Sequence, residues 1–162
     1  MKINLIAVGT KMPFWVDEAV GEYQKRLPGN FELIVSEIPL AKRTKANPDI
    51  ARLCETEGKD LLKAVTRNQY LVALDVKGKS MATEVMAGKI NKVMENGQDL
   101  ALLVGGPDGL SAQCLDAANE KWSLSALTLP HTIVRIVVAE QTYRENGKAS
   151  CREAVKTLCG GV

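Results

Sequence analysis

The chain of 162 residues is short of the side chains on which several kinds of active site depend. It has a single histidine, His131, and its four cysteines, Cys54, Cys114, Cys151 and Cys159, show no CxxC spacing. Zinc sites take their ligands mainly from these residue types at close spacing, so we expect no metal site. No serine lies in a G-x-S-x-G sequence, and one imidazole is too few for a nucleophilic triad that follows that pattern.

The chain also lacks long apolar runs and an excess of charge of either sign. No segment approaches the roughly 18 apolar residues of a membrane span, so we expect no membrane association. The first residues, MKINLIAVGTK, form too short an apolar run for an export signal, and thiols without CxxC spacing are typical of the reducing cytoplasm. The net charge of +2 neither requires nor excludes a nucleic-acid partner.

What the chain does have is a regular alternation of short apolar segments with helical patterns. Strands are expected at Lys2–Val8, Phe31–Ile38, Tyr70–Val76, Leu100–Val104 and Trp122–Leu129. Helices are expected from Pro13 to Leu27, at Asp49–Thr66 and Thr83–Asn96, from Ser111 onward, and at Thr132–Arg144. This alternation predicts a single α/β domain over residues 1–144, with a mostly parallel sheet flanked by helices.

Apolar spacing also predicts which helix faces are buried. In the first helix, Trp15, Ala19, Tyr23 and Leu27 recur at a spacing of four. In the second helix, the predicted buried face includes Ile50, together with Leu53, Leu61, Leu62 and Val65.

The segment LALLVGGPDGL, residues 100–110, is the strongest indication of a ligand site. Its apolar strand ends at Gly105, Gly106 and Gly109, which remove side chains where the backbone turns. Parallel sheets bind ligands outside the carboxyl ends of their strands, where these glycines fall. The turn is neither a P-loop nor a G-x-G-x-x-G sequence, and it is also compatible with a tight connection that binds nothing.

Basic residues occur at two further places, each open to a structural and a functional interpretation. The polar segment PLAKRTKANP, with Lys42, Arg43 and Lys45, is either a solvated loop or a phosphate-contacting arm. His131 is either a capping or packing residue or a catalytic one. Arg135 lies one turn later on the same helix face, and Arg144 closes the helix. Both arginines suit phosphate or carboxylate recognition, or a solvated rim.

Several motifs in order resemble one known family. These are LIAVGTK, ALDVKGK at 73–79, LLVGGPDGLS at 102–111 and WSLSALTLPHTIVRIVVAEQTYR at 122–144. Together they resemble the SPOUT methyltransferases that methylate N3 of a pseudouridine in large-subunit (23S) ribosomal RNA. The resemblance extends from Met1 to Arg144.

The resemblance implies an α/β fold with a C-terminal trefoil knot, and a homodimer that builds each active site across its interface. It implies S-adenosylmethionine as cofactor and, as substrate, ribosomal RNA in the assembled 70S ribosome. The cofactor-binding residues that it implies are Leu74, Gly105, Gly106, Leu124, Ser125, Ala126, Leu127, Thr128, Leu129 and Pro130. Arg135 and Arg144 are the candidate catalytic residues, because they would stabilise the N3 anion or hold a neighbouring phosphate.

The resemblance ends at Arg144. The family continues into a short tail with aromatic residues that ends in Tyr-His and basic residues, whereas residues 145–162 here contain neither an aromatic residue nor a histidine. Two interpretations therefore stand beside the active enzyme. One is a dimeric protein that binds S-adenosylmethionine or RNA without efficient turnover. The other is an α/β enzyme that binds a phosphorylated small molecule at the glycine turn.

Overall fold

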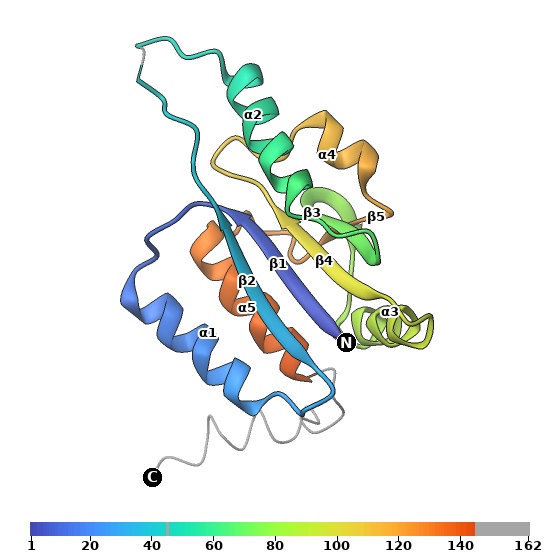
Figure 1. The fold of residues 1–162 in the computed structure, drawn as a ribbon. Coiled ribbons are helices and arrows are strands. Elements are labelled where there is room, and N and C mark those ends of the chain that lie inside the picture. The colour runs from blue at the N-terminus through green and yellow to red at the C-terminus, as the bar shows by residue number, and fades with distance from the viewer. Residues whose placement is uncertain (45, 145–162) are drawn as a thin grey trace.

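The computed structural model describes residues 1–44 and 46–144, which form a five-stranded sheet with helices on both faces (Figure 1). The strand order is β2-β1-β4-β3-β5, and every neighbouring pair is parallel. The strands are β1 (Lys2–Val8), β2 (Glu32–Ile38), β3 (Gln69–Ser80), β4 (Asp99–Val104) and β5 (Glu120–Ser123). The predicted α/β class is confirmed, while the divergent tail from residue 145 lies outside the described residues.

Five helices cover the sheet: α1 (Phe14–Arg26), α2 (Ile50–Lys63), α3 (Thr83–Glu95), α4 (Ala112–Ala117) and α5 (His131–Arg144). Apolar side chains of β1 alternate between the two faces, as a period of two requires. Ile3 and Leu5 pack with residues of α1, α3 and α5, whereas Ile6 and Val8 pack with residues of α2 and α4. No helix of this described region is long and apolar enough to cross a bilayer.

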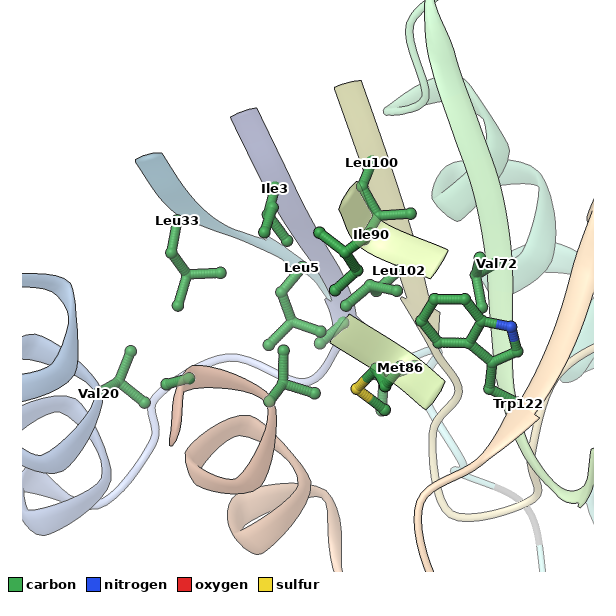
Figure 2. Close-up of a cluster of buried hydrophobic side chains, with 14 of the residues drawn as sticks. Ile3, Leu5, Val20, Leu33, Val72, Met86, Ile90, Leu100, Leu102 and Trp122 are labelled. Atoms are coloured by element: carbon green, nitrogen blue, oxygen red, sulfur yellow. The ribbon is translucent and has the colours of Figure 1, made fainter. Parts of the chain in front are cut away.

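The larger core lies between the sheet and the helices α1, α3 and α5 (Figure 2). Leu5 and Leu102, from the neighbouring central strands β1 and β4, lie at its middle, and Met86 and Ile90 reach it from α3. Trp122 of β5 closes one end and is almost completely buried. Since this side chain also reaches the carboxyl edge of the sheet, the core and the candidate site share a residue.

Local signals place the helix ends where the sequence predicts them. Asp49 caps α2 by accepting a hydrogen bond from the Arg52 amide at 3.3 Å, and Ser111 caps α4 in the same way. Gly97, with φ of +69°, follows the last residues of α3. Ile50, predicted to be buried, is 40% exposed because it lies in the first turn of α2, ahead of the part that meets the core.

The buried face of α1 differs from the predicted one. Val16 and Val20 are buried, and Tyr23 and Leu27 pack beside them, but Trp15 is half exposed. A constant spacing of four moves about 40° around a helix at each step, because one turn takes 3.6 residues. The stripe that faces the core therefore follows spacings of four, three and four from Val16.

The strands at the β3–β5 edge also depart from prediction. β3 does not end at Val76 but continues to Ser80 past an irregularity between Leu74 and Lys79, and Trp122 pairs with both of these residues. The predicted strand Trp122–Leu129 is wrong beyond Ser123. Serine hydroxyls in this segment bond to nearby backbone groups and so compete with a sheet ladder.

Candidate functional site

A cavity of about 700 Å³ lies at the carboxyl ends of β4 and β5 and beside residues 74–76 of β3, within the size range of small-molecule sites. Its walls come from three segments that are far apart in the chain, and from the start of α5. The lining residues are Leu74, Asp75 and Val76; Val104, Gly105, Gly106, Pro107, Gly109 and Leu110; Trp122, Ser123, Leu124, Ser125, Leu127, Thr128, Leu129 and Pro130; and His131 and Val134. The edge of the sheet predicted for a ligand therefore carries this cavity.

The glycine turn after β4 folds back on itself. The Gly109 amide donates a hydrogen bond to the Gly106 carbonyl at 3.0 Å, and Gly109 has φ of +82°, a conformation that side chains disfavour. A Cβ atom on Gly105 would lie 2.4 Å from the Gly109 carbonyl carbon. Gly105 is therefore required by the turn itself, before any ligand is considered.

The loop after β5 forms the opposite wall and is held by two serines. The Ser123 hydroxyl donates a hydrogen bond to the Ser125 carbonyl at 3.0 Å, and the Leu127 amide donates to the Ser125 hydroxyl at 3.0 Å. These local bonds turn the backbone out of the sheet. Leu127 is 72% exposed and, since it lines the cavity, it stands at the mouth.

The chemistry of the walls is apolar, with few charged groups. Among the described residues that line the cavity, only Asp75 and His131 are titratable, and none is Lys or Arg. Asp75 directly follows Leu74, and its carboxylate accepts a weak hydrogen bond from the Lys77 amide at 3.4 Å. Such walls suit a ligand with an apolar or aromatic body and at most a small number of polar groups.

Trp122 is held in the cavity wall by a polar cluster beneath it. Its indole Nε1–H donates to Glu120 at 2.8 Å, and the same carboxylate accepts from Lys89 Nζ at 2.7 Å and from the Tyr70 hydroxyl at 3.0 Å. Burial alone would raise the pKa of Glu120, but the hydrogen bonds from Lys89, Trp122 and Tyr70 outweigh burial and lower it. The Glu120 carboxylate therefore serves as a charged acceptor for all three donors.

The structure brings nearly all of the predicted cofactor residues together around the cavity. Leu74, Gly105, Gly106 and the residues of 124–130 other than Ala126 line it; Ala126 is exposed and does not. Sequence reasoning did not include Asp75 and Trp122. Asp75 directly follows the predicted Leu74, and Trp122 lies two positions before the predicted Leu124, so closeness in sequence was the available signal.

Arg135, one of the candidate catalytic residues, lies elsewhere. Its guanidinium is buried and donates to Glu37 at 2.8 Å and to the Gly9 carbonyl at 2.7 Å. Its Nε is buried and has no hydrogen-bond partner among residues 1–44 and 46–144. Arg135 borders a smaller cavity of about 290 Å³ between α1, β2 and α5, with Asp17 among its lining residues. These contacts join α5 to β2 and to the loop after β1.

Arg144, the other candidate, lies at the end of α5 and does not line the large cavity. Its Nε donates to Glu140 one turn earlier, and Glu140 also accepts from Gln141 at 2.6 Å. About a quarter of its side chain is exposed. His131 begins α5 and lines the large cavity, whereas Arg135 borders the smaller one. Their shared helix face therefore does not bring both residues to the same site.

The basic residues of the segment after β2 have different surroundings in the structure. Arg43 pairs with Asp108 at 2.6 Å and with Glu57 at 3.1 Å, whereas Lys42 is exposed. Lys45 lies outside the described residues. The described residues contain no cluster of three or more His, Cys, Asp or Glu side chains that could hold a metal ion.

The fold is that of an α/β protein with a cavity at the carboxyl edge of a parallel sheet. A family model described as SPOUT methyltransferase matches residues 1–147, so the chain belongs to the SPOUT methyltransferase family.

Two solved structures share the fold. One is a methylase family protein from Neisseria gonorrhoeae, 14% identical, with a TM-score of 0.54 over 91% of this chain and 84% of that one. The other is a probable methyltransferase from Bordetella pertussis Tohama I, 16% identical, with a TM-score of 0.54 over 88% of this chain and 95% of that one. At these identities the likeness concerns the fold alone.

Proposed function

We propose that this protein is an S-adenosylmethionine-dependent methyltransferase that methylates N3 of a pseudouridine in 23S ribosomal RNA of the assembled ribosome, in the cytoplasm. The observation that carries the proposal is the cavity. In a chain of the SPOUT family, it is lined by the three segments that the sequence resemblance assigns to the cofactor.

The residues of the cavity fit S-adenosylmethionine. The Gly105 and Gly106 backbone, without side chains in the way, offers polar groups for the edge of an adenine, and apolar side chains such as Leu124 and Leu129 suit its faces. Asp75 provides the one carboxylate for a cofactor with ammonium and sulfonium cations. Because no Lys or Arg lines the described cavity, a phosphorylated ligand is less well matched, since phosphate sites use such cations.

When bound, S-adenosylmethionine supplies an electrophilic methyl group on a sulfonium sulfur. The chain's own task is then to hold the acceptor nitrogen in line and to favour loss of its proton. We assign anion stabilisation or phosphate binding to Arg144, whose exposed part can meet a second molecule. The same role predicted for Arg135 stays a prediction, and its burial favours a structural function.

We also propose the homodimer and the trefoil knot that the resemblance implies. Arg144 and the cavity belong to different parts of one chain, and an active site built across a two-fold interface would give Arg144 a route to the partner's cofactor. The assembled ribosome as substrate agrees with a net charge of only +2, because the ribosome can supply part of the docking surface.

The alternative is a dimeric protein that binds S-adenosylmethionine or RNA but turns over poorly, because residues 145–162 lack the aromatic Tyr-His ending of the family. The two proposals share the cavity and differ in the acceptor side of the site. They therefore predict the same cofactor affinity and different methyl transfer.

The test is calorimetric titration with S-adenosylmethionine, followed by single-turnover methyl transfer to unmodified 70S ribosomes with the same protein sample. Binding with transfer is the expected result for the enzyme. Binding without transfer would support the impaired protein. No binding, especially with binding of nucleotides or sugar phosphates instead, would reject both and favour the phosphorylated ligand.

Arg144→Ala tests the acceptor side separately. We expect at least a tenfold slower single-turnover rate with unchanged cofactor affinity, because the side chain acts on the RNA and not on the cavity. Lys63→Ala, which removes an exposed cation of α2, is the matched control. An unchanged rate together with unchanged RNA affinity would exclude Arg144 from the reaction.

A further inference from the structure

The glycine turn, defined here as residues 105–109, has two faces with different surroundings. Gly105, Gly106, Pro107 and Gly109 line the cavity, but Asp108 does not. The Asp108 carboxylate instead accepts two hydrogen bonds from Arg43, at 2.6 Å from Nη2 and 3.2 Å from Nε. The one charged residue of the turn is therefore bound from outside the cavity.

Arg43 is itself fixed by a buried carboxylate. Its Nη1 donates to Glu57 at 3.1 Å and to the Ala41 carbonyl at 3.0 Å. The same Glu57 oxygen accepts the Ala41 amide at 3.1 Å, and only 2% of the Glu57 side chain is exposed. A single guanidinium thus joins α2, the segment after β2 and the glycine turn.

The segment after β2 also packs directly on the turn. A Cβ atom on Gly106 would lie 3.1 Å from Glu57 Oε2, 3.2 Å from a Val8 methyl and 3.3 Å from a Leu40 methyl. The Gly106 side of the turn therefore has little room to move toward α2. Arg43 holds the other side at Asp108, so the turn is restrained at both ends.

From these contacts we propose that Arg43 is a positioning residue: its bridge between Glu57 and Asp108 holds the glycine turn in the shape that binds the cofactor. Its significance for catalysis depends on the proposed function, whereas its effect on the turn does not. The inference also assigns this cation of the basic segment an intramolecular role in place of RNA binding. Ligand binding to the held turn stabilises the bridge in return, because coupling between sites is reciprocal.

The first measurement needs no ligand. Amide hydrogen exchange at Gly109, whose N–H bonds to Gly106 within the turn, is followed by NMR in the full chain. We expect Arg43→Ala and Asp108→Asn each to speed this exchange about tenfold, because both release the same restraint. Arg26→Ala, which removes a surface ion pair of α1 with Glu22, is the matched control and leaves it unchanged. Unchanged exchange in Arg43→Ala would overturn the proposal.

The second measurement is S-adenosylmethionine affinity in a double-mutant cycle. Each single variant is expected to bind about tenfold more weakly, and the double variant no more weakly than either, because Arg43 acts through Asp108. Additive losses, or faster exchange with unchanged affinity, would overturn the positioning role. Arg43→Lys should recover only part of the affinity, since one ammonium cannot reproduce the guanidinium's fork to two carboxylates.

A third measurement separates positioning from RNA contact. In steady-state methyl transfer, Arg43→Ala should raise the KM for S-adenosylmethionine and leave the KM for ribosomes and its salt dependence unchanged. A raised KM for ribosomes with a smaller salt slope would instead show a phosphate contact and overturn the proposal. If the wild-type chain bound no S-adenosylmethionine, the proposed function would fail, and the exchange experiment alone would decide whether Arg43 holds the turn.

Discussion

At the scale of single residues, the shape of the candidate site depends on a glycine that has no side chain. Gly105 has no Cβ, and the backbone of Gly109 and Leu110 occupies the space that one would fill. The neighbouring backbone cannot yield easily, because it belongs to the same short turn. At this turn the cavity wall is thus formed by main chain.

Gly105→Ala is therefore expected to impair the site more than the fold. The clash with backbone 2.4 Å away should cost roughly 1–3 kcal/mol of unfolding free energy and weaken S-adenosylmethionine binding at least tenfold. Calorimetry and urea unfolding measure the two effects. Gly88→Ala in α3, where nothing lies within 4 Å, is the control; it should leave the affinity unchanged and raise stability slightly, because alanine favours a helix interior over glycine. Equal affinity in the two variants would show that the turn does not contact the cofactor.

At the scale of elements, the irregular pairing of β3 with β5 shapes one side of the cavity. Trp122 pairs with both Leu74 and Lys79, and Gly78 lies directly on the Trp122 backbone. Because Trp122 lines the cavity, this irregular pairing affects a wall of the cavity as well as the edge of the sheet.

Gly78→Ala is expected to displace β5. Its Cβ would lie 2.7 Å from the Trp122 carbonyl carbon, a backbone atom that no rotamer change can remove. We expect a loss of roughly 1–3 kcal/mol and a red shift of tryptophan fluorescence as the indole meets water. Gly21→Ala in α1, with open space around it, serves for comparison. A wild-type spectrum and stability would contradict this close packing of Gly78 on β5.

The Glu120 cluster predicts a dependence of stability on pH. Since the pKa of Glu120 is lowered below its ordinary value of 4.5, its contribution to folding is present above that value and is lost as pH falls through the folded-state pKa. Glu120→Gln should cost about 1–3 kcal/mol at pH 7, because three donors lose a charged acceptor. This cost should stay constant down to about pH 5 and shrink below pH 4.5.

Urea unfolding of both proteins across this range measures the difference. Glu22→Gln on the surface of α1 controls for the general effect of removing one carboxylate. A difference that grows as the solution becomes more acidic would have the wrong sign and would exclude the cluster as its source.

At the scale of the whole molecule, the chain presents a cavity at one edge of the sheet and Arg144 at the far end of α5. If the active site is shared between two chains, two impaired variants can complement each other. Mixing Gly105→Ala with Arg144→Ala after joint unfolding and refolding should produce mixed dimers with one intact site and restore methyl transfer. Sedimentation equilibrium should give twice the chain mass of 17.6 kDa. A monomer, or no activity in the mixture, would contradict a shared site.

Prediction from the sequence is least reliable where local contacts compete with contacts between distant residues. The apolar runs of β1 and β4 predict buried parallel strands because such runs satisfy both faces of a covered sheet. Helix ends at Asp49, Ser111 and Gly97 are predictable because caps act within a few residues. The segment WSLSALTL alternates like a strand, yet its serines bond locally and only the pairing with β3 shows where β5 ends.

The sequence by itself determined the α/β class, the edge of the sheet that carries the cavity and about half of the residues that line it. These features follow from periodicity, from glycines at strand ends and from motifs that resemble a family. Tertiary structure alone decided which cations are paired with carboxylates inside the chain. Arg43 and Arg135 carry the same charge as Lys42, but each is paired with a carboxylate more than ten positions away. Such pairing depends on how the chain folds, because charges distant in sequence meet only when the elements between them are packed.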